Sequence, residues 1–578
     1  MPARTVYTML EDTAAAFGER IALQQPTGDG KYQAYTWAQV RDHVRDVALG
    51  LEALGVKVGD MVGLQSETRA EFYFADMGVM TCGAIAAALY TSLPYAEQAA
   101  ALKFCEASVA FVENLKALRG LRSALGTEDA SRIRWIVLTG DSESELTLAA
   151  VMEAGRKKFA EDPGAFTRLL ESFDDQATAV LYMTSGATGE PKMGLVTHRA
   201  LVTNVDMTPF VLPLTPDDST IAFLPSAHIA QRVVAELMPM RTGSTVWFSE
   251  GLSKLPHEIR SARPTFFLSP PRLWERIYSS ITAEFKKRPA PVRQLIYFAI
   301  GMGSRAANLR RVGKPVPTWM RVLLARFDKM MFSKIRERLG GRLKVPISGA
   351  APLSKELAEF YEAIGMPLLE GYGLTEGGVV SFNPIGRLKP GSIGKLLPGV
   401  EARIDEDGEL LVKSPANFTG YYKDPTATAA IFRDGWLATG DIASIDEEGY
   451  YYITGRKKEL IVASNGKKIY PARIENLFKM QPVINHVLLI GDRLPFVTAL
   501  ITVNGNPQEA APVVARTVKE INKQLASFEQ IRKYKILDRE FSIEHGELTP
   551  TMKLRRARAI ENHRALVNEL YAGREFET

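Results

Sequence analysis

Short apolar runs alternate with longer amphipathic segments along most of the chain. Segments 37–54 and 94–105 have apolar positions at helical spacing. Between such segments, the clearest strand candidates are the runs at 61–65, 108–112, 133–138, 220–224 and 265–268. This alternation predicts an α/β architecture.

The pattern changes after Gly394. Two acidic turns ending in glycine, at 405–408 and 446–449, separate short apolar stretches. Short strands joined by tight turns are typical of a β-rich unit. We therefore predict a small β-rich subdomain at about 394–456.

Composition sets further bounds. With 578 residues, 46% of them hydrophobic and 24% charged, the chain is expected to be globular with more than one domain. Segment 7–17 is an acid-bearing helix rather than a signal peptide, and no run approaches the roughly 20 apolar residues of a membrane span. Cys82 and Cys105 are too few for a disulfide framework and are expected to be buried. These features predict a cytoplasmic protein.

The segment 182–192 (YMTSGATGEPK) carries the clearest chemical signal. The apolar run 177–183 predicts a buried strand, and the small residues after it allow backbone N–H groups to converge on an anion. Lys192 could then reach bound phosphates. A Walker loop ends in Gly-Lys-Ser/Thr, whereas here Pro191 precedes the lysine and Met193 follows it, so a kinase or GTPase is not favoured. Taken alone, an ordinary Gly-Thr turn is the alternative.

Five further motifs follow in order. They are Gly-Ala-Ala-Pro at 349–352, Gly-Tyr-Gly-Leu-Thr-Glu at 371–376, Thr-Gly-Asp at 439–441, Gly-Arg-Lys-Lys-Glu at 455–459 and Leu-Thr-Pro-Thr-Met-Lys at 548–553. With these motifs the chain, from about residue 7 to residue 556, resembles the adenylate-forming superfamily of acyl-CoA synthetases, peptide-synthetase adenylation domains and luciferases. This ordered resemblance outweighs the reading of each motif as an isolated turn.

The resemblance implies an ATP site. Tyr372 offers an aromatic face to adenine, Thr375 a hydroxyl to the α-phosphate, and Glu376 a hard carboxylate suited to Mg²⁺. Asp441 and Arg456 can hydrogen-bond the ribose. Alone, Asp441 could be a turn residue and Glu376 a solvated carboxylate. The remaining expected nucleotide contacts are Thr184, Ser185, Gly186, Thr188, Gly189 and Lys192 on the phosphates, and Gly349, Ala350, Ala351 and Gly371 on the base.

Lys553 is the expected catalytic cation. Attack of a carboxylate on the α-phosphate brings two anions together, so a positive charge must stabilise the transition state. The alternative is that Lys553 belongs to a solvated basic tail with Arg555, Arg556 and Arg558.

The resemblance also implies a second half-reaction with CoA. In the family a small mobile α+β C-terminal domain pivots at the position of Lys458, and its other face presents a glycine loop, matched by Gly466, to CoA. Lys467 and Lys468 could approach the CoA phosphates, or they could simply be solvent-exposed lysines on a turn. We expect a large N-terminal adenylation domain of α/β subdomains with the β-rich subdomain, at 1–456, and the C-terminal domain at 457–578.

Two segments indicate the acyl substrate. Residues 223–234 (FLPSAHIAQRVV) are similar to the acyl-pocket motif of long-chain fatty acyl-CoA synthetases, which implies that His228 borders the carboxylate end of the acyl group. A helix-capping or core histidine is the alternative. An insertion at 285–344 also resembles long-chain members. We expect long-chain fatty acid, ATP and CoA as substrates, with an acyl-AMP ligase, an acyl-carrier-protein ligase or a low-activity acyl-nucleotide-binding protein as alternatives.

The insertion is strongly basic. It holds sixteen Lys or Arg against Asp328 and Glu337, a net charge of +14, so the rest of the chain carries −9 of the total +5. Interleaved apolar stretches at 295–300 and 319–332 make it amphipathic. This pattern suits peripheral contact with an anionic membrane at its inner face. Nucleic acid is not expected because no reader motif accompanies the charge. A solvated face remains the alternative, and we expect a monomer or homodimer.

Two positions depart from the family pattern. Ala187 replaces a threonine of the phosphate loop, and Met193 stands where the family usually has glycine. Both put the turnover rate in question but leave the fold prediction intact.

Overall fold

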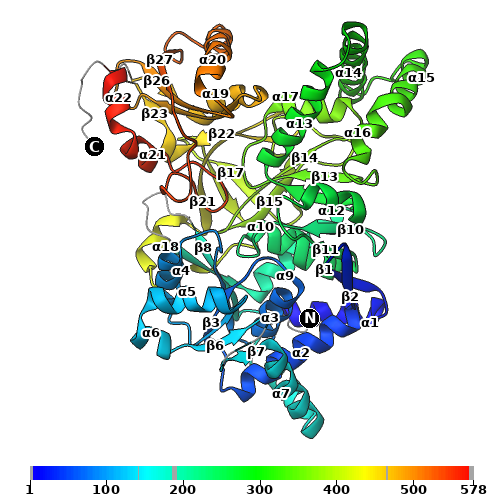
Figure 1. Cartoon of the computed structure of the whole chain (residues 1–578), viewed down its shortest axis with the longest axis vertical. Helices are drawn as coiled ribbons and strands as arrows, with labels where there is room; N and C mark the ends of the chain where they lie inside the picture. Colours follow the sequence, from blue (N-terminus) through cyan, green and yellow to red (C-terminus); the bar gives the residue numbers. More distant parts are fainter. Residues whose placement is uncertain (1–3, 141, 143, 185–191, 464–465, 572–578) are drawn as a thin grey trace.

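The computed structural model describes residues 4–140, 142, 144–184, 192–463 and 466–571. It is a mixed α/β fold, with the C-terminal domain at one end of the long axis and the N-terminal helices and their sheet at the other (Figure 1). The α/β architecture predicted from the alternating pattern is confirmed.

A mixed sheet forms the centre of the first half of the chain. Its strand order is β19-β9-β8-β4-β3-β5-β6-β7. The strands are β3 (Met61–Gln65), β4 (Ile85–Ala88), β5 (Val109–Val112), β6 (Arg134–Val137), β7 (Leu146–Thr147), β8 (Thr178–Thr184), β9 (Lys192–Thr197) and β19 (Gly420–Tyr421). Val180 and Tyr182 of β8 belong to the core on one face, whereas Leu181 belongs to the core on the other. Burial on both faces explains why this strand is a continuous apolar run.

Two further sheets complete the α/β part. Their strand orders are β10-β11-β1-β2 and β12-β13-β14-β15-β16. The strands are β1 (Ile21–Gly28), β2 (Lys31–Thr36), β10 (Ser219–Ala222), β11 (Thr245–Phe248), β12 (Phe266–Ser269), β13 (Val345–Ser348), β14 (Leu369–Leu374), β15 (Gly378–Phe382) and β16 (Lys395–Leu396). The five strand candidates and the run 177–183 are therefore confirmed.

Helices cover these sheets. The predicted helices at 37–54 and 94–105 are α2 (Trp37–Ala53) and α4 (Tyr95–Phe104). The others are α1 (Val6–Phe17), α3 (Ala70–Thr81), α5 (Leu115–Leu125), α6 (Thr127–Ser131), α7 (Leu148–Glu161), α8 (Gly164–Glu171), α9 (His198–Asp206), η1 (Thr208–Phe210), α10 (Ile229–Gln231), η2 (Arg232–Leu237), α11 (Met238–Thr242), α12 (Leu255–Ala262) and α17 (Lys355–Ala363). Cys82 and Cys105 are buried free thiols, as expected.

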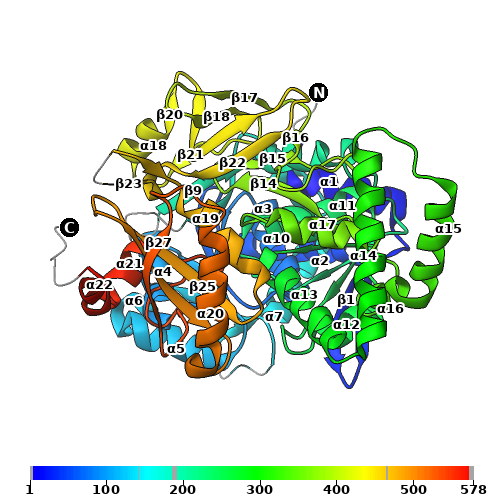
Figure 2. The same ribbon diagram turned by 90° about the horizontal axis from the view of Figure 1, so that it is seen from above.

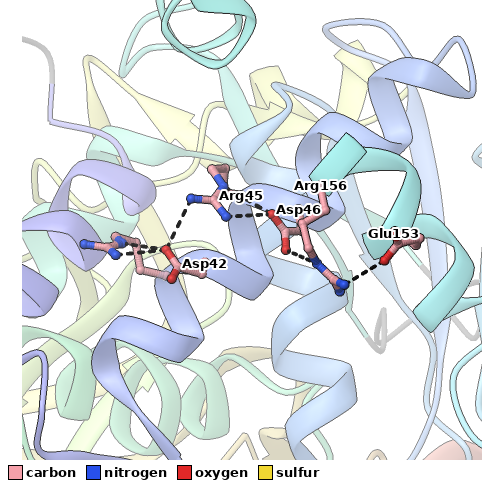
Figure 3. Close-up of polar contacts among 6 residues, drawn as sticks. Asp42, Arg45, Asp46, Glu153 and Arg156 are labelled. Carbon is pink, nitrogen blue, oxygen red and sulfur yellow. Dashed lines mark hydrogen bonds and ion pairs between the residues drawn. The ribbon is translucent and has the colours of Figure 1, made fainter. Parts of the chain in front are cut away.

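Helices α2 and α7 pack unusually closely because glycines lie at their contact. A Cβ placed on Gly155 would lie 1.8 Å from the carbonyl oxygen of Asp46, so only hydrogen fits there. A chain of ion pairs runs across the same contact, in which the buried Asp46 accepts from Arg45 and from Arg156 at 3.1 Å, and Arg156 also binds Glu153 (Figure 3).

The β-rich subdomain is also confirmed. It has the strand order β17-β18-β21-β20, with β22 paired to β21. Its elements are β17 (Glu401–Ile404), β18 (Glu409–Lys413), α18 (Pro425–Ile431), β20 (Phe432–Arg433), β21 (Trp436–Ile445) and β22 (Tyr451–Arg456).

The C-terminal domain follows directly. It contains a sheet of order β25-β26-β27 and a small β23-β24 ladder. Its elements are η4 (Lys457–Glu459), β23 (Ile461–Val462), β24 (Lys468–Ile469), α19 (Pro471–Leu477), η5 (Phe478–Met480), β25 (Ile484–Ile490), β26 (Val497–Val503), α20 (Pro507–Asn522), β27 (Ile531–Ile536), α21 (Arg556–Asn562) and α22 (Arg564–Leu570).

The basic insertion forms a set of helices at the edge of the molecule. They are α13 (Pro271–Lys286), α14 (Ala290–Arg311), α15 (Thr318–Phe327), η3 (Asp328–Phe332) and α16 (Ser333–Glu337). Both views place α14 and α15 at the periphery, and Figure 1 shows them at the same end as the C-terminal domain (Figures 1 and 2). Across the described part of the chain, no helix combines the length and apolarity needed to cross a bilayer.

Candidate active site

A cleft of about 2630 Å³ lies between the N-terminal and C-terminal domains. Residues from both domains line it. Of the residues expected from the sequence, those on its wall are Ala350, Ala351, Gly371, Tyr372, Asp441, Arg456, Lys458 and Lys553. The cleft therefore brings together motifs that are up to two hundred residues apart in the sequence.

The expected phosphate loop is the connection of a β-hairpin. β8 and β9 pair in antiparallel register with Thr184 opposite Lys192, and the Thr184 hydroxyl donates to the Lys192 carbonyl oxygen at 3.2 Å. Ser185, Gly186, Ala187, Thr188 and Gly189 lie outside the described residues. Met193 on β9 is buried in the core, which explains how a large side chain is accommodated there.

Lys192 and Glu376 share a neighbour that the sequence did not indicate. Tyr421 of β19 donates its hydroxyl to Glu376 Oε1 at 2.8 Å, and Lys192 Nζ lies 5.1 Å from the centre of the Tyr421 ring. Lys192 Nζ also lies 3.6 Å from Asp424. Burial and the Glu376 charge raise the pKa of Tyr421. Thr375 and Glu376 occupy the turn between β14 and β15, so β19 braces this turn against the phosphate-loop hairpin.

Tyr372, Asp441 and Arg456 form a connected polar group. Asp441 on β21 is opposite Arg456 on β22, and its Oδ1 accepts from Arg456 Nε at 3.0 Å. Its Oδ2 accepts from the Tyr372 hydroxyl at 2.6 Å. Burial, together with the Asp441 charge, raises the pKa of Tyr372, so the phenol stays protonated. These contacts hold the aromatic ring and the carboxylate in a fixed relation on the cleft wall.

The small-residue segment at 349–352 follows the carboxyl end of β13. Ala350 has a φ of +66°, in the left-handed region that favours glycine and that other residues rarely adopt. Gly371 is equally constrained, because a Cβ there would lie 2.8 Å from the Phe382 ring. Both positions therefore keep the backbone accessible to a flat ligand beside Tyr372.

Lys553 lies on a tight loop of the C-terminal domain. Its backbone N–H donates to Thr549 Oγ1 at 3.0 Å, and its carbonyl accepts from Thr549 N at 2.8 Å. The side chain is open to the cleft but surrounded by protein on several sides. This desolvation, with the nearby Arg456 charge, lowers the pKa of Lys553 to about 8, although Asp441 and Glu376 oppose the shift. The loop thus directs a cation to the expected nucleotide site rather than to a solvated tail.

His228 caps a short helix, which is the alternative role that the sequence left open, while its place beside the acyl carboxylate stays a prediction. Its Nδ1 accepts from the backbone N–H of Ala230 at 3.1 Å, which caps the short helix α10. Burial, with the nearby Lys553 charge, lowers the pKa of His228 to about 3. The ring is therefore neutral at physiological pH, and the proton lies on Nε2, which is free to donate.

A buried ion pair supports the helical segment that carries His228. Arg232, four residues later in the π-helical segment η2, binds Asp76 of α3, and its guanidinium lies 5.4 Å from the centre of the Tyr182 ring. Burial raises the pKa of the adjacent Glu236, which keeps it neutral beside this pair. The π-helical stretch and the three buried groups were not predicted from the sequence.

Comparison with known proteins agrees with this geometry. Residues 10–422 match the family described as AMP-binding enzyme, and residues 458–575 match the AMP-binding enzyme C-terminal domain. The chain belongs to the AMP-binding enzyme family.

Curated relatives cover nearly the whole of this AMP-binding enzyme. A long-chain-fatty-acid–CoA ligase, FadD15, of Mycobacterium bovis is 32% identical over 569 residues, covering 94% of this chain and 93% of the relative. The long-chain-fatty-acid–CoA ligase ACSBG2 of Xenopus laevis is 27% identical, covering 99% and 84%. Among solved structures, the anthranilate CoA ligase AuaEII in complex with anthranoyl-AMP has a TM-score of 0.75 at 20% identity, covering 97% and 98%, and shows the same fold.

The junction between the two domains of this AMP-binding enzyme is well anchored. Lys457, directly after β22, binds Asp407 and Glu409, the latter at 2.9 Å, and Lys458 follows it on the cleft wall. Gly466 lies in the β23–β24 turn with a φ of +77° and is not among the residues that line the cleft. The described orientation therefore presents Lys553, and not Gly466, to the cleft.

Proposed function

We propose that this AMP-binding enzyme activates a long-chain fatty acid with ATP to acyl-AMP and pyrophosphate, and then transfers the acyl group to CoA with release of AMP. The observation that carries the proposal is the position of Lys553 beside the charges of Glu376 and Asp441 and close enough to His228 to shift its pKa. The names of the curated relatives support the long acyl chain and CoA as acceptor.

In the first step, a carboxylate oxygen of the fatty acid bonds to the α-phosphorus, and the bond from that phosphorus to the pyrophosphate oxygen breaks. Lys553 stabilises the charge that develops on the α-phosphate, and Thr375 donates a hydrogen bond to it. His228 donates from Nε2 to the fatty-acid carboxylate. Thr184, Lys192 and the loop between them hold the β- and γ-phosphates.

The nucleoside binds through the segment at 349–351 and through Tyr372, Asp441 and Arg456 on the cleft wall. Adenine stacks on Tyr372 beside Gly349, Ala350 and Ala351, and the ribose hydroxyls bind Asp441 and Arg456. Asp441 can accept from a ribose hydroxyl because a carboxylate has about four acceptor positions and two are used by Tyr372 and Arg456.

Mg²⁺ fits this site with few protein ligands. Among the described residues, no group of three or more His, Cys, Asp or Glu side chains could hold a metal. Glu376 uses Oε1 to accept from Tyr421, which leaves Oε2 for a cation. Mg²⁺ commonly binds one or two carboxylates together with water and phosphate oxygens, so Glu376 would hold it against the triphosphate, where it neutralises phosphate charge.

In the second step, the CoA sulfur bonds to the acyl carbon, the bond from that carbon to the AMP oxygen breaks, and the thiol proton is released. We propose that the C-terminal domain, residues 457–578, turns about Lys458 relative to residues 1–456. The turn withdraws Lys553 and brings the Gly466 loop to the pantetheine, with Lys467 and Lys468 near the CoA phosphates. The proposal places the protein in the cytoplasm, as a monomer or homodimer, in peripheral contact with the inner face of the membrane.

The test is pyrophosphate release measured with a series of fatty acids from octanoate to oleate, with and without CoA. The proposal predicts about one equivalent without CoA, continuous turnover with CoA, and the highest kcat/KM for the long chains. Turnover that requires an acyl carrier protein instead of CoA would identify the alternative acceptor. If no fatty acid led to pyrophosphate release, the proposal that the enzyme activates fatty acids would be wrong.

A further inference from the structure

The outer side of α14, α15 and η3 exposes large apolar side chains. Trp319 on α15 is 59% exposed and Phe298 on α14 is 54% exposed. Exposed neighbours are Tyr297, Val312, Val322 and Met330. The inner side of the same helices is packed normally, since a Cβ on Gly303 would lie 2.1 Å from the carbonyl oxygen of Ala363 in α17. The exposed apolar groups therefore present surface to solvent beyond the packed inner side of this helical set.

Positive charge surrounds these apolar groups. Of the sixteen Lys and Arg residues in 285–344, four form ion pairs with carboxylates: Arg311, Arg336, Arg338 and Lys344. The other twelve form none within the described residues. The unpaired ones near the outer side of α14, α15 and η3 are Arg305, Arg310, Lys314, Arg321, Arg326 and Lys329. Twelve of the sixteen cations are thus available to an external partner.

The sequence of α15 shows how both properties reach one side. Trp319, Val322 and Arg326 follow one another at spacings of three and four residues, which places them on one face of α15. The exposed Lys329 follows in η3. Met320 and Phe327 on the opposite face are buried. The helix therefore has an apolar face that packs against the protein and a mixed aromatic and cationic face that is exposed to solvent.

We propose that this outer face of α14, α15 and η3 binds the surface of an anionic lipid bilayer. Cations near such a surface gain about 1 kcal/mol each, and tryptophan is favoured at the lipid–water interface because its ring is apolar and its N–H is polar. A second copy of this face would be repelled by its own charge. Nucleic acid would use the cations but not the exposed Trp319, Val322 and Met330. This inference rests on the proposed function. It adds to that function by naming the surface from which a long-chain fatty acid is taken.

The experiment is sedimentation of the full-length protein with phosphatidylcholine vesicles that either contain or lack phosphatidylglycerol, at low salt. The test variant is the triple change Arg321→Gln, Arg326→Gln, Lys329→Gln. The matched control, Lys31→Gln, Lys57→Gln, Lys116→Gln, removes the same charge from exposed positions elsewhere. We expect binding to anionic vesicles alone, a loss of about 100-fold in the partition coefficient for the test variant at about 1 kcal/mol per cation, and little change for the control.

A second measurement follows insertion. Among the six tryptophans, Trp319 is the exposed one, so brominated lipid should quench the wild-type emission and fail to quench that of Trp319→Phe. Failure of the wild type to bind, equal losses in both triple variants, or tighter binding to duplex DNA than to vesicles would each overturn the proposal. Concentration-dependent dimerisation abolished by the test variant would assign the face to a second copy instead. Pyrophosphate release on octanoate without vesicles tests the proposed function separately, and the test variant should retain it.

Discussion

Lys479 of the C-terminal domain donates a hydrogen bond to the carbonyl oxygen of Pro352, at 3.1 Å, in the segment proposed to bind adenine. Its Nζ also lies 3.8 Å from Glu275 of α13, and burial lowers its pKa. A neighbouring contact joins Arg272 of α13 to Asn485 at 3.3 Å. The segment proposed to bind adenine is therefore hydrogen-bonded directly to the domain that carries Lys553, which links the proposed nucleotide site to domain orientation.

Replacing Lys479 with methionine should weaken the orientation that presents Lys553. A hydrogen bond to a charged group contributes about 1.5–3 kcal/mol, so we expect pyrophosphate release to slow at least tenfold. Thioester formation from supplied acyl-AMP and CoA should be retained, because the proposed second step uses the other orientation. The control is Lys519→Met, an exposed lysine on α20. Equal losses in both half-reactions would show that the contact supports folding rather than orientation.

Tyr372→Phe removes one of the two bonds that hold Asp441. The stacking ring is kept, but the carboxylate loses a partner at 2.6 Å and is free to rotate. We expect the KM for ATP to rise about ten- to a hundredfold with a smaller change in kcat, measured by steady-state pyrophosphate release. Tyr32→Phe, on the distant strand β2, is the control. An unchanged KM for ATP would show that the hydrogen bond from Tyr372 to Asp441 does not contribute to ATP binding.

The pKa of Lys553 predicts a pH dependence. In the proposed mechanism the protonated lysine stabilises the α-phosphate, and desolvation lowers its pKa to about 8 in the free enzyme. The kcat/KM for ATP, which reports the free enzyme, should therefore fall as pH rises through about 8. Lys553→Arg should lower the rate but lose this descending limb, because a guanidinium stays charged. A wild-type profile that is flat to pH 10 would contradict the role of the lysine charge.

Gly155→Ala tests the close contact between α2 and α7. The new methyl would meet the Asp46 carbonyl at 1.8 Å, and overpacking of this kind costs about 1–3 kcal/mol. We expect a lower temperature for the first thermal unfolding transition. Gly301→Ala in α14 is the matched control, since its methyl meets nothing within 4 Å and alanine favours a helix by about 0.5–1 kcal/mol. A higher unfolding temperature for both variants would contradict this prediction, because it would show that α7 moves away from α2 to make room for the methyl group.

Local pattern was enough to predict the strands and the β-rich subdomain. β8 could be recognised because both its faces are buried, and the turns at 405–408 and 446–449 marked tight connections between strands. The order of the motifs indicated Tyr372, Asp441, Arg456 and Lys553, which the structure gathers on one cleft. The effect of Ala187 stays a prediction, because it lies outside the described residues.

Contacts between distant segments could not be predicted from the sequence. Tyr421 reaches Glu376 because β19 pairs with β9, more than two hundred residues earlier, and no spacing rule encodes that pairing. Glu370 was also missed, although burial raises its pKa to about 8 and it accepts from the backbone N–H of Leu353 at 3.1 Å. Such residues become visible only when tertiary packing fixes their neighbours.

The most direct test of the two-step account is Lys553→Ala assayed in both half-reactions. Pyrophosphate release from fatty acid and ATP should fall by several orders of magnitude, since removal of a transition-state charge partner costs about 2.7–4 kcal/mol or more. Conversion of supplied acyl-AMP and CoA to thioester should continue at close to the wild-type rate. An equal loss in both half-reactions, or full pyrophosphate release without the lysine, would contradict the account.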